Sequence, residues 1–354
     1  MAAAPDRPAR ILRLGSLEDV VASVPHMLGF QPRDSVVAVA LTGPRGRMGF
    51  SVRLDLLPEE YDADVAAAVS AHLEHAGADA ALLFVYTGPP VGGDLPRRPL
   101  VEQLQRRLAV PVQDAVLVTD ARIWSYLCSD ECCPPEGRPL DAKAPGATAI
   151  AAAHALEGRA VLPSREALVR SVAPIGGIAA ASMDQAIERA AASQLSVGEQ
   201  AFSASAATLF SDLLERFATA PADVTHDEAA MLIVGLHDIV LRDGALADCL
   251  RDLDAARWLF TQLARRAIPP LDAPVCTVLG FVAYAQGDGV IATTALERAL
   301  DSEPGYALAE LLLTALRGQV PPDEIRRAAR SSARTRARPV PPRVPRPRRS
   351  ARRR

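Results

Sequence analysis

An unbroken apolar run, Ala80-Ala-Leu-Leu-Phe-Val-Tyr86, stands out in the first half of the chain. Strands that are covered on both faces carry such runs, whereas a strand with one solvated face alternates apolar and polar residues. This run therefore predicts a central strand. The runs at Ser35–Leu41 and Ala115–Thr119 predict two more strands, and Met48–Leu56 forms a hairpin with the first of them.

Helical patterns lie between these strands. Val65, Val69 and Leu73 recur every four residues, and Val101 and Leu104 begin a similar apolar face. A helix that connects two strands of one sheet makes them parallel, through a crossover that is nearly always right-handed. The first part of the chain is therefore expected to contain a sheet with parallel strands and crossover helices.

The order of strands and helices also predicts strand directions. We expect the strands near Val52, Phe84 and Leu117 to be parallel, and the strand at Val37 to pair antiparallel at one side of the sheet. The predicted fold class is an α/β N-terminal domain with a mixed, mainly parallel sheet, followed by an all-α, partly tetratricopeptide-like C-terminal domain.

The sequence changes character after Pro145, where strand signals mostly stop and long amphipathic helical patterns begin. A chain of 354 residues is expected to form two domains, since a single core rarely grows this large. The predicted organisation is a disordered start at 1–10, an α/β domain at 11–145, a helical domain at 146–325 and a disordered tail rich in arginine and proline at 326–354.

One segment of the helical half resembles a tetratricopeptide unit. Leu279-Gly280, Ala292, Leu296, Ala299 and Pro304 fall at the spacings of that repeat, whose small residues let two antiparallel helices approach. The match is to one unit, and about three are needed for a free-standing solenoid, so an ordinary helical hairpin stays open as an alternative. A tetratricopeptide-like half predicts a groove for a protein partner.

Charge is distributed unevenly along the chain. The stretch from Arg326 to Arg354 holds 13 arginines and no acid, so the remaining 26 basic residues face 42 acidic ones and the body carries about −16. A basic tail on an acidic body suits nucleic acid or an acidic partner, although solubility alone also explains it.

The sequence indicates a cytoplasmic protein without a membrane segment. Residues Met1–Arg10 contain prolines and charges but lack the apolar core of a signal peptide. The apolar stretch Ala229–Leu241 is interrupted by His237 and Asp238, and no other run reaches the length of a membrane span. In the cytoplasm the five cysteines are expected to be reduced unless they bind metal or carry out redox chemistry.

The carboxyl ends of the predicted strands are the expected place for a ligand, because loops and helix N-termini converge there in open parallel sheets. Carboxylates, glycines and an arginine in that position predict a site for a phosphate, or for a metal with an anionic ligand. The competing interpretation is that the two strand-end aspartates cap helices or pair with nearby arginines. The candidate ligand-binding residues are Asp55, Gly88, Gly92, Gly93, Asp94, Asp120 and Arg122.

Three of the five cysteines, Cys128, Cys132 and Cys133, fall within six residues. As thiolates they suit zinc, but a second pair does not follow, so Cys249, Cys276 or a histidine would have to complete the site. A disulfide from Cys128 to either neighbour could act as a redox switch, whereas a nucleophilic cysteine would need a base that no local histidine supplies. The sequence favours a packed turn in which the cysteines act as small hydrophobes, with zinc as a possible cofactor.

The cysteine segment also carries a resemblance to a known family. Trp124-Ser-Tyr126-x-Cys128, followed by Cys132-Cys133-Pro-Pro-Glu-Gly137, is similar to the hallmark of an actinobacterial family known only as a domain of unknown function. The resemblance extends from Ile11 to about Pro322 and includes the stretches 28–35, 53–55 and 303–306. It implies kinship and brings no activity with it.

Three functions are consistent with these features. The first is a binding or regulatory protein, with a small anionic ligand at the strand ends and a partner on the helical half. The second is a metal-assisted enzyme in which Asp55, Asp120 and Arg122 act on a phosphorylated or carboxylated substrate. The third is a protein that binds nucleic acid through its basic tail. The sequence favours the first, since no base, nucleophile or metal set stands at a recognisable spacing.

Overall fold

The structure, a computed structural model, describes residues 14–128, 130–141, 144–156, 161–219 and 223–336. The chain divides into two compact units, residues 1–171 and 172–354. A sheet in the N-terminal half and a helical C-terminal half confirm the predicted fold class at this level. The observed division lies 26 residues beyond the expected boundary at 145, because two short helices after the sheet belong to the first unit.

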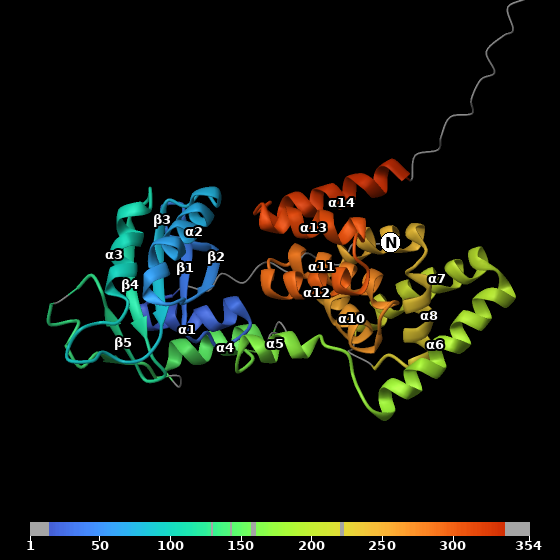
Figure 1. The fold of residues 1–354 in the computed structure, drawn as a ribbon, viewed down its shortest axis with the longest axis horizontal. Helices are drawn as coiled ribbons and strands as arrows, with labels where there is room; N and C mark the ends of the chain where they lie inside the picture. The colour runs from blue at the N-terminus through green and yellow to red at the C-terminus, as the bar shows by residue number, and fades with distance from the viewer. Residues whose placement is uncertain (1–13, 129, 142–143, 157–160, 220–222, 337–354) are drawn as a thin grey trace, which may run out of the picture. The chain divides into compact units, whose positions relative to one another are not determined.

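The first unit is built on one mixed sheet of six strands in the order β2-β1-β3-β4-β5-β6 (Figure 1). The pair β3–β4 is parallel, and the other neighbouring pairs are antiparallel. The strands are β1 Ser35–Thr42, β2 Arg47–Asp55, β3 Ala80–Tyr86, β4 Val112–Val118, β5 Arg122–Ser125 and β6 Arg138–Pro139.

The position of β1 corrects the predicted sheet. Strands β2, β3 and β4 do run in the same direction, as expected, but β1 lies between β2 and β3 and not at one side. Consequently the sheet is not mainly parallel within the described residues. The burial of the strands explains this order: β1 is almost wholly buried and needs a neighbour on each side, whereas β2 is largely exposed and takes the edge.

Helices cover the sheet and close its core. Helices α2 and α3 contribute Val69, Leu73, Leu100 and Leu104 to the core against one face of the sheet. Helix α1 begins at the N-cap Ser16, whose side chain accepts a hydrogen bond from the Asp19 N–H, and it ends at Gly29 in a left-handed conformation. The helix continues through Pro25. The helices of this unit are α1 Leu17–Leu28, η1 Glu59–Tyr61, α2 Asp62–His75, α3 Arg98–Arg107, α4 Pro145–Leu156 and α5 Arg165–Ser171.

The second unit is helical throughout its described residues. Its centre is α11, in which every residue from Asp272 to Ala285 is buried. Such a helix is apolar on all sides, which explains why its sequence lacks an amphipathic pattern. The helices are α6 Ile178–Val197, α7 Glu199–Thr219, α8 His226–Gly235, α9 Ile239–Cys249, α10 Leu253–Arg266, α11 Asp272–Ala285, α12 Gly289–Ser302, α13 Ala307–Arg317 and α14 Pro322–Arg336.

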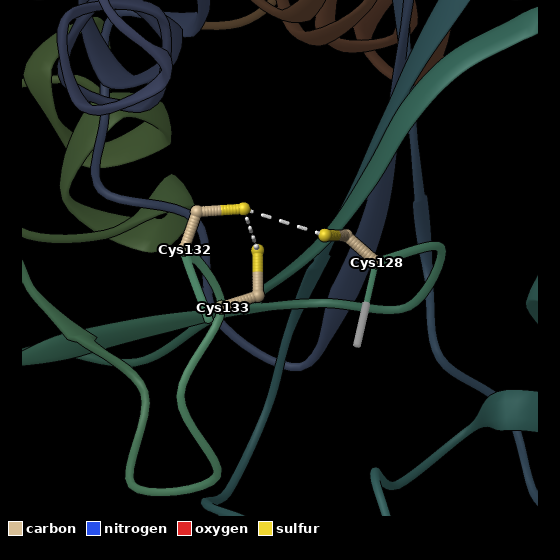
Figure 2. Close-up of side chains that lie close together, drawn as sticks. All are labelled: Cys128, Cys132 and Cys133. Atoms are coloured by element: carbon tan, nitrogen blue, oxygen red, sulfur yellow. Dashed lines mark hydrogen bonds between the residues drawn. The ribbon is translucent and has the colours of Figure 1, made fainter. Parts of the chain in front are cut away.

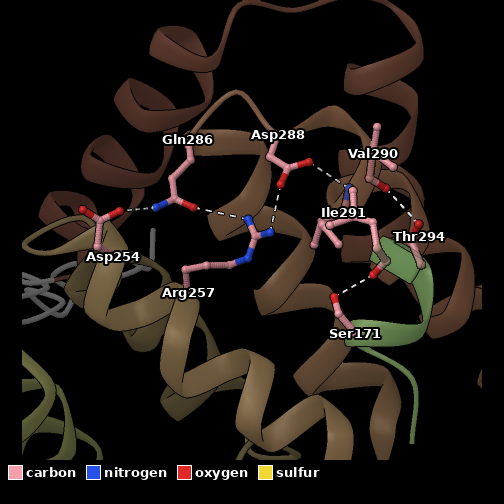
Figure 3. Close-up of polar contacts among 9 residues, drawn as sticks. Ser171, Asp254, Arg257, Gln286, Asp288, Val290, Ile291 and Thr294 are labelled. Atoms are coloured by element: carbon pink, nitrogen blue, oxygen red, sulfur yellow. Dashed lines mark hydrogen bonds and ion pairs between the residues drawn. The ribbon is translucent and has the colours of Figure 1, made fainter. Parts of the chain in front are cut away.

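A polar network ties the turn between α11 and α12 to α10 (Figure 3). The Arg257 guanidinium donates to Asp288 at 2.9 Å and to the Gln286 side-chain oxygen at 3.3 Å. Asp288 is also the N-cap of α12, because its carboxylate accepts from the Ile291 N–H at 3.0 Å. The Asp288 carboxylate thus caps α12 and also pairs with Arg257 of α10. These two contacts hold the turn between α11 and α12 in place against α10.

The tail prediction needs a correction. Residues 326–336, expected to be disordered, form the end of α14, which packs against α9 and α11. The negative charges of Asp323 and Glu324 in its first turn interact favourably with the positive end of the helix dipole. The Tyr284 hydroxyl holds the turn before the helix by donating to the Val320 carbonyl at 2.7 Å. The remaining residues 337–354, and the start at 1–10, lie outside the described residues. No described helix is long and apolar enough to cross a membrane.

The contact between α11 and α12 gives a test of the helical core. A Cβ added at Gly280 would lie 2.6 Å from Leu296 Cγ, so Gly280→Ala must push the two helices apart. We expect a loss of about 1–3 kcal/mol in the free energy of unfolding, measured by urea denaturation of the full chain.

Gly244 in α9 provides the matched control. An added Cβ there meets nothing within 4 Å, so Gly244→Ala changes only helix propensity. This control should stabilise the protein by up to about 1 kcal/mol. Equal effects of the two substitutions would contradict the close packing of α11 on α12.

Candidate functional site

A cavity of about 500 Å³ lies in the first unit beside β5 and the segment that joins β5 to β6. Cavities of this size hold small molecules. Apolar side chains, two arginines, two acidic residues and two of the three clustered cysteines line it. The lining residues are Leu17, Gly93, Leu95, Arg98, Ile123, Trp124, Ser125, Cys128, Asp130, Glu131, Cys133, Pro134, Pro135 and Arg138.

Trp124 in β5 forms one wall and is held by the chain that returns toward β6. Its indole N–H donates to the Pro135 carbonyl at 3.0 Å. A turn closes there, with the Gly137 N–H donating to the Pro134 carbonyl at 2.8 Å. Gly137 has φ +77° and its missing Cβ would lie 2.4 Å from Trp124 Cε2, so only glycine fits both the turn and the ring.

Arg122 of β5 also binds the return segment. Its guanidinium donates to the Glu136 carbonyl at 3.0 Å and to the Gly137 carbonyl at 2.7 Å. Arg122 was a candidate ligand-binding residue, but in the structure its Nη1 group binds main-chain oxygens and it does not line the cavity. The arginine therefore closes a loop around the cavity instead of lining it.

Ser125 organises the start of the cysteine segment. Its hydroxyl oxygen accepts hydrogen bonds from the N–H groups of Leu127 and Cys128, each at 3.1 Å, and its hydroxyl donates to Asp114 at 3.2 Å. Asp114 also accepts from the Ala115 N–H at 2.8 Å. Burial raises the pKa of Asp114 in spite of these hydrogen bonds.

Tyr126 connects the cysteine segment to the loop before α3. Its buried hydroxyl donates to the Pro96 carbonyl at 2.6 Å, and burial raises its pKa. The Arg98 guanidinium lies 5.9 Å from the centre of the Tyr126 ring and donates to the Tyr126 carbonyl at 3.5 Å. Tyr126 therefore positions Arg98 at the edge of the cavity.

The three clustered cysteines converge (Figure 2), and two of them, Cys128 and Cys133, line the cavity. The Cys132 Sγ lies 3.5 Å from Cys128 Sγ and 3.9 Å from Cys133 Sγ. A hydrogen bond from the Asp130 N–H and contacts with the two neighbouring thiols lower the pKa of Cys128, while burial raises the pKa of Cys133 to about 12.

The comparison with family models now places this segment in a family. A family described as a domain of unknown function, DUF4192, matches residues 18–323. The chain belongs to the DUF4192 family. Searches of curated proteins and of solved structures return no match. The DUF4192 match includes the whole cavity apart from Leu17, so the site lies within the region that defines the family.

The strand-end residues of this DUF4192 chain are not brought together. Asp55 ends β2 and Asp120 follows β4, with β1 and β3 between these strands, a separation of roughly 14 Å at the spacing of paired strands. Asp55 is 67% exposed and pairs with Arg53 at 2.6 Å, which is the competing interpretation made from the sequence. Asp120 is exposed in the turn before β5.

The glycine loop after β3 contributes less than expected. Asp94 closes a turn through its N–H, which donates to the Val91 carbonyl at 3.2 Å. Of this loop's candidates, Gly93 lines the cavity, while Gly88, Gly92 and Asp94 do not. Two glycines with positive φ, Gly92 and Gly93, let the chain turn back toward α3.

Several residues of the site were missed by sequence reasoning. Arg98 directly follows Arg97, and nothing in the sequence distinguishes the two arginines, while Arg138 lies in a two-residue strand that no pattern reveals. Arg138 binds Glu18 of α1, with Nε donating to the carboxylate at 2.8 Å. Ser125 was the one such residue that the sequence could have indicated. A serine before a turn often bonds to the main chain, and Ser125 stands in that position directly after Trp124.

Asp114 offers a test based on pH. Its raised pKa means that the native state keeps the proton longer than the unfolded chain, so ionisation costs native stability. As the pH rises through the window above the ordinary value of 3.8, wild type should lose stability relative to Asp114→Asn, which keeps the acceptor oxygen without the charge. Urea midpoints of both proteins from acidic to neutral pH measure this. A difference that does not change with pH would contradict it.

Gly137 offers a second test. In a Trp258→Phe background, which leaves Trp124 as the remaining tryptophan, Gly137→Ala should displace the indole and shift its fluorescence. Stability should fall by about 2–4 kcal/mol, from the left-handed backbone and the clash together.

The control is Gly43→Ala in the turn between β1 and β2. Gly43 has φ +70° and open space around its missing Cβ, so it separates backbone strain from the Trp124 contact. We expect Gly43→Ala to lower the free energy of unfolding by about 1–2 kcal/mol and to leave the Trp124 fluorescence unchanged. If both variants leave the fluorescence unchanged, Trp124 does not rest on Gly137.

Proposed function

We propose that this DUF4192 chain is a binding or regulatory protein whose first unit takes a small ligand in the cavity beside β5. The ligand class is an apolar, planar body with one anionic group. The observation that carries this proposal is the lining of a single cavity by the Trp124 ring, by aliphatic and proline side chains, and by the Arg98 guanidinium. The regulatory role in the cytoplasm remains the prediction made from the sequence.

Arg98 is the residue that we expect to bind the anionic group of the ligand. The other arginine of the cavity, Arg138, is neutralised by Glu18. No ion pair joins Arg98 to a carboxylate among the residues that the structure describes. Arg98 is also the first residue of α3, where the positive end of the helix dipole favours a negative charge.

This proposal moves the predicted ligand site from the strand ends to the cavity. Gly93 is common to both. The separation of Asp55 from Asp120 weakens the alternative of a metal-assisted enzyme that uses both carboxylates, since one ion cannot contact carboxylates roughly 14 Å apart.

The aromatic sulfonate anilinonaphthalene sulfonate has the required shape and charge and serves as the probe. In the Trp258→Phe background it should quench Trp124 and fluoresce in a saturable titration of the native protein. Arg98→Gln should weaken its affinity about fivefold, close to 1 kcal/mol for a partly exposed charge contact.

Arg106→Gln is the matched control for charge. Arg106 lies on the same helix, is exposed and pairs with Glu102, away from the cavity. This variant should bind the probe as wild type does. Equal weakening by both substitutions, or a titration without quenching of Trp124, would remove the cavity as the binding site.

We also propose that α11 and α12 form a tetratricopeptide-like hairpin within a helical half that docks a protein partner. The support is the small residue Gly280 in contact range of Leu296, at the spacing of that repeat. An experimental structure in which the two helices cross at an angle foreign to such repeats would contradict the hairpin.

A further inference from the structure

The chain uses its cysteines in two different ways. Cys249 and Cys276 lie in helices and are 0% and 1% exposed, as expected for cysteines that fill space in a core. Cys132 is exposed, and Cys128 and Cys133 are half-buried at the surface of the first unit. Packing of small hydrophobes, the interpretation favoured from the sequence, does not account for three thiols that meet at a surface.

The spacing of the three sulfur atoms fits a metal ion. Zinc binds thiolates at about 2.3 Å with tetrahedral angles, which places neighbouring sulfurs about 3.8 Å apart. The observed separations of Cys132 Sγ from Cys128 Sγ and Cys133 Sγ are 3.5 and 3.9 Å, and all three sulfurs lie within 4.8 Å of one another (Figure 2). The two measured sulfur separations are therefore close to the spacing that a tetrahedral zinc site requires.

The main chain on both sides of the cluster is held in place. On one side the Ser125 hydroxyl accepts from the Cys128 N–H, and within the segment the Cys133 N–H donates to the Asp130 carbonyl at 2.8 Å. On the other side Arg122 and Trp124 bind the carbonyls of the return segment. Ligands that are preorganised in this way bind a metal without a large ordering cost.

The charge beside the cluster is mixed. Three thiolates on a divalent ion leave a net charge of −1. Arg98 lines the same cavity as Cys128 and Cys133 and supplies a positive charge, whereas Arg138 is paired with Glu18, and the acidic Asp130 and Glu131 also line the cavity. Soft thiolate ligands select zinc over the harder calcium and magnesium ions.

We propose that Cys128, Cys132 and Cys133 bind one zinc ion at the wall of the cavity. A water or the donor atom of a ligand would take the fourth coordination position, and Cys128 and Cys133 also line the cavity. The site is assembled from one short segment and does not require a ligand in the cavity, so it stands independently of the proposed function.

Metal analysis of the untagged full-length chain, purified under reducing conditions without chelators, tests the site. Wild type should contain one zinc ion per chain by elemental analysis. Cobalt(II) in place of zinc should give the intense sulfur-to-metal charge-transfer absorption of a thiolate site. Each of Cys128→Ser, Cys132→Ser and Cys133→Ser should weaken zinc affinity at least about a hundredfold, measured by competition with a chromophoric chelator.

The double variant Cys249→Ala, Cys276→Ala is the matched control, since it removes the two buried thiols and should keep one zinc ion per chain. Circular dichroism of each serine variant checks that it is folded. The three serine positions lie in a surface segment outside the helices and sheet, so the fold should survive.

Three results would overturn the proposal. One is substoichiometric zinc in wild type together with cobalt(II) that shows no charge-transfer absorption. Another is metal content that is the same in wild type and in the triple serine variant. A third is a reduced wild type that binds no metal while mild oxidation joins Cys128 to Cys132, which would assign the cluster to redox switching.

Discussion

The candidate site depends on one set of hydrogen bonds, from the Arg122 guanidinium to the carbonyls of Glu136 and Gly137. Those carbonyls belong to a segment with little regular structure, and β6 is only two residues long. Without the arginine, the partly buried Gly137 carbonyl would lose its donor at a cost of about 1–3 kcal/mol, whereas water can replace the donor at the exposed Glu136 carbonyl. The contact of Trp124 with Gly137 adds a steric fit to the same junction. The cavity exists because this segment is returned to β5.

The sheet shows how far local patterns predict a fold. The apolar run at 80–86 did predict the central strand, and the pattern around Val69 did predict a crossover helix. The strand order was predicted wrongly although the sequence held a signal for it, since β1 is a nearly unbroken apolar run while polar residues interrupt β2. The predicted order followed the crossover helices and did not use this difference.

The same distinction applies to the candidate site. The cysteine segment could be found from sequence, since its three thiols lie within six residues and needed only a turn to meet. Asp55 and Asp120 were also predicted to share a site, but their proximity depended on the order of four strands. Because β1 and β3 lie between β2 and β4, the two aspartates are far apart. Arg98 and Arg138 could not be found, because each is brought to the cavity by tertiary contacts, with Tyr126 and with Glu18 respectively.

The contiguity of the cysteine segment has a consequence for chain entropy. Bringing Cys128, Cys132 and Cys133 together closes loops of about five residues, whereas joining the ends of β2 and β4 closes one of about 65. Loop-closure entropy grows with the logarithm of length, so the short closure is cheaper by about 2 kcal/mol. A cluster of this kind can gather its thiols before distant strands pair. It is thus the one part of the candidate site whose assembly does not wait for the sheet.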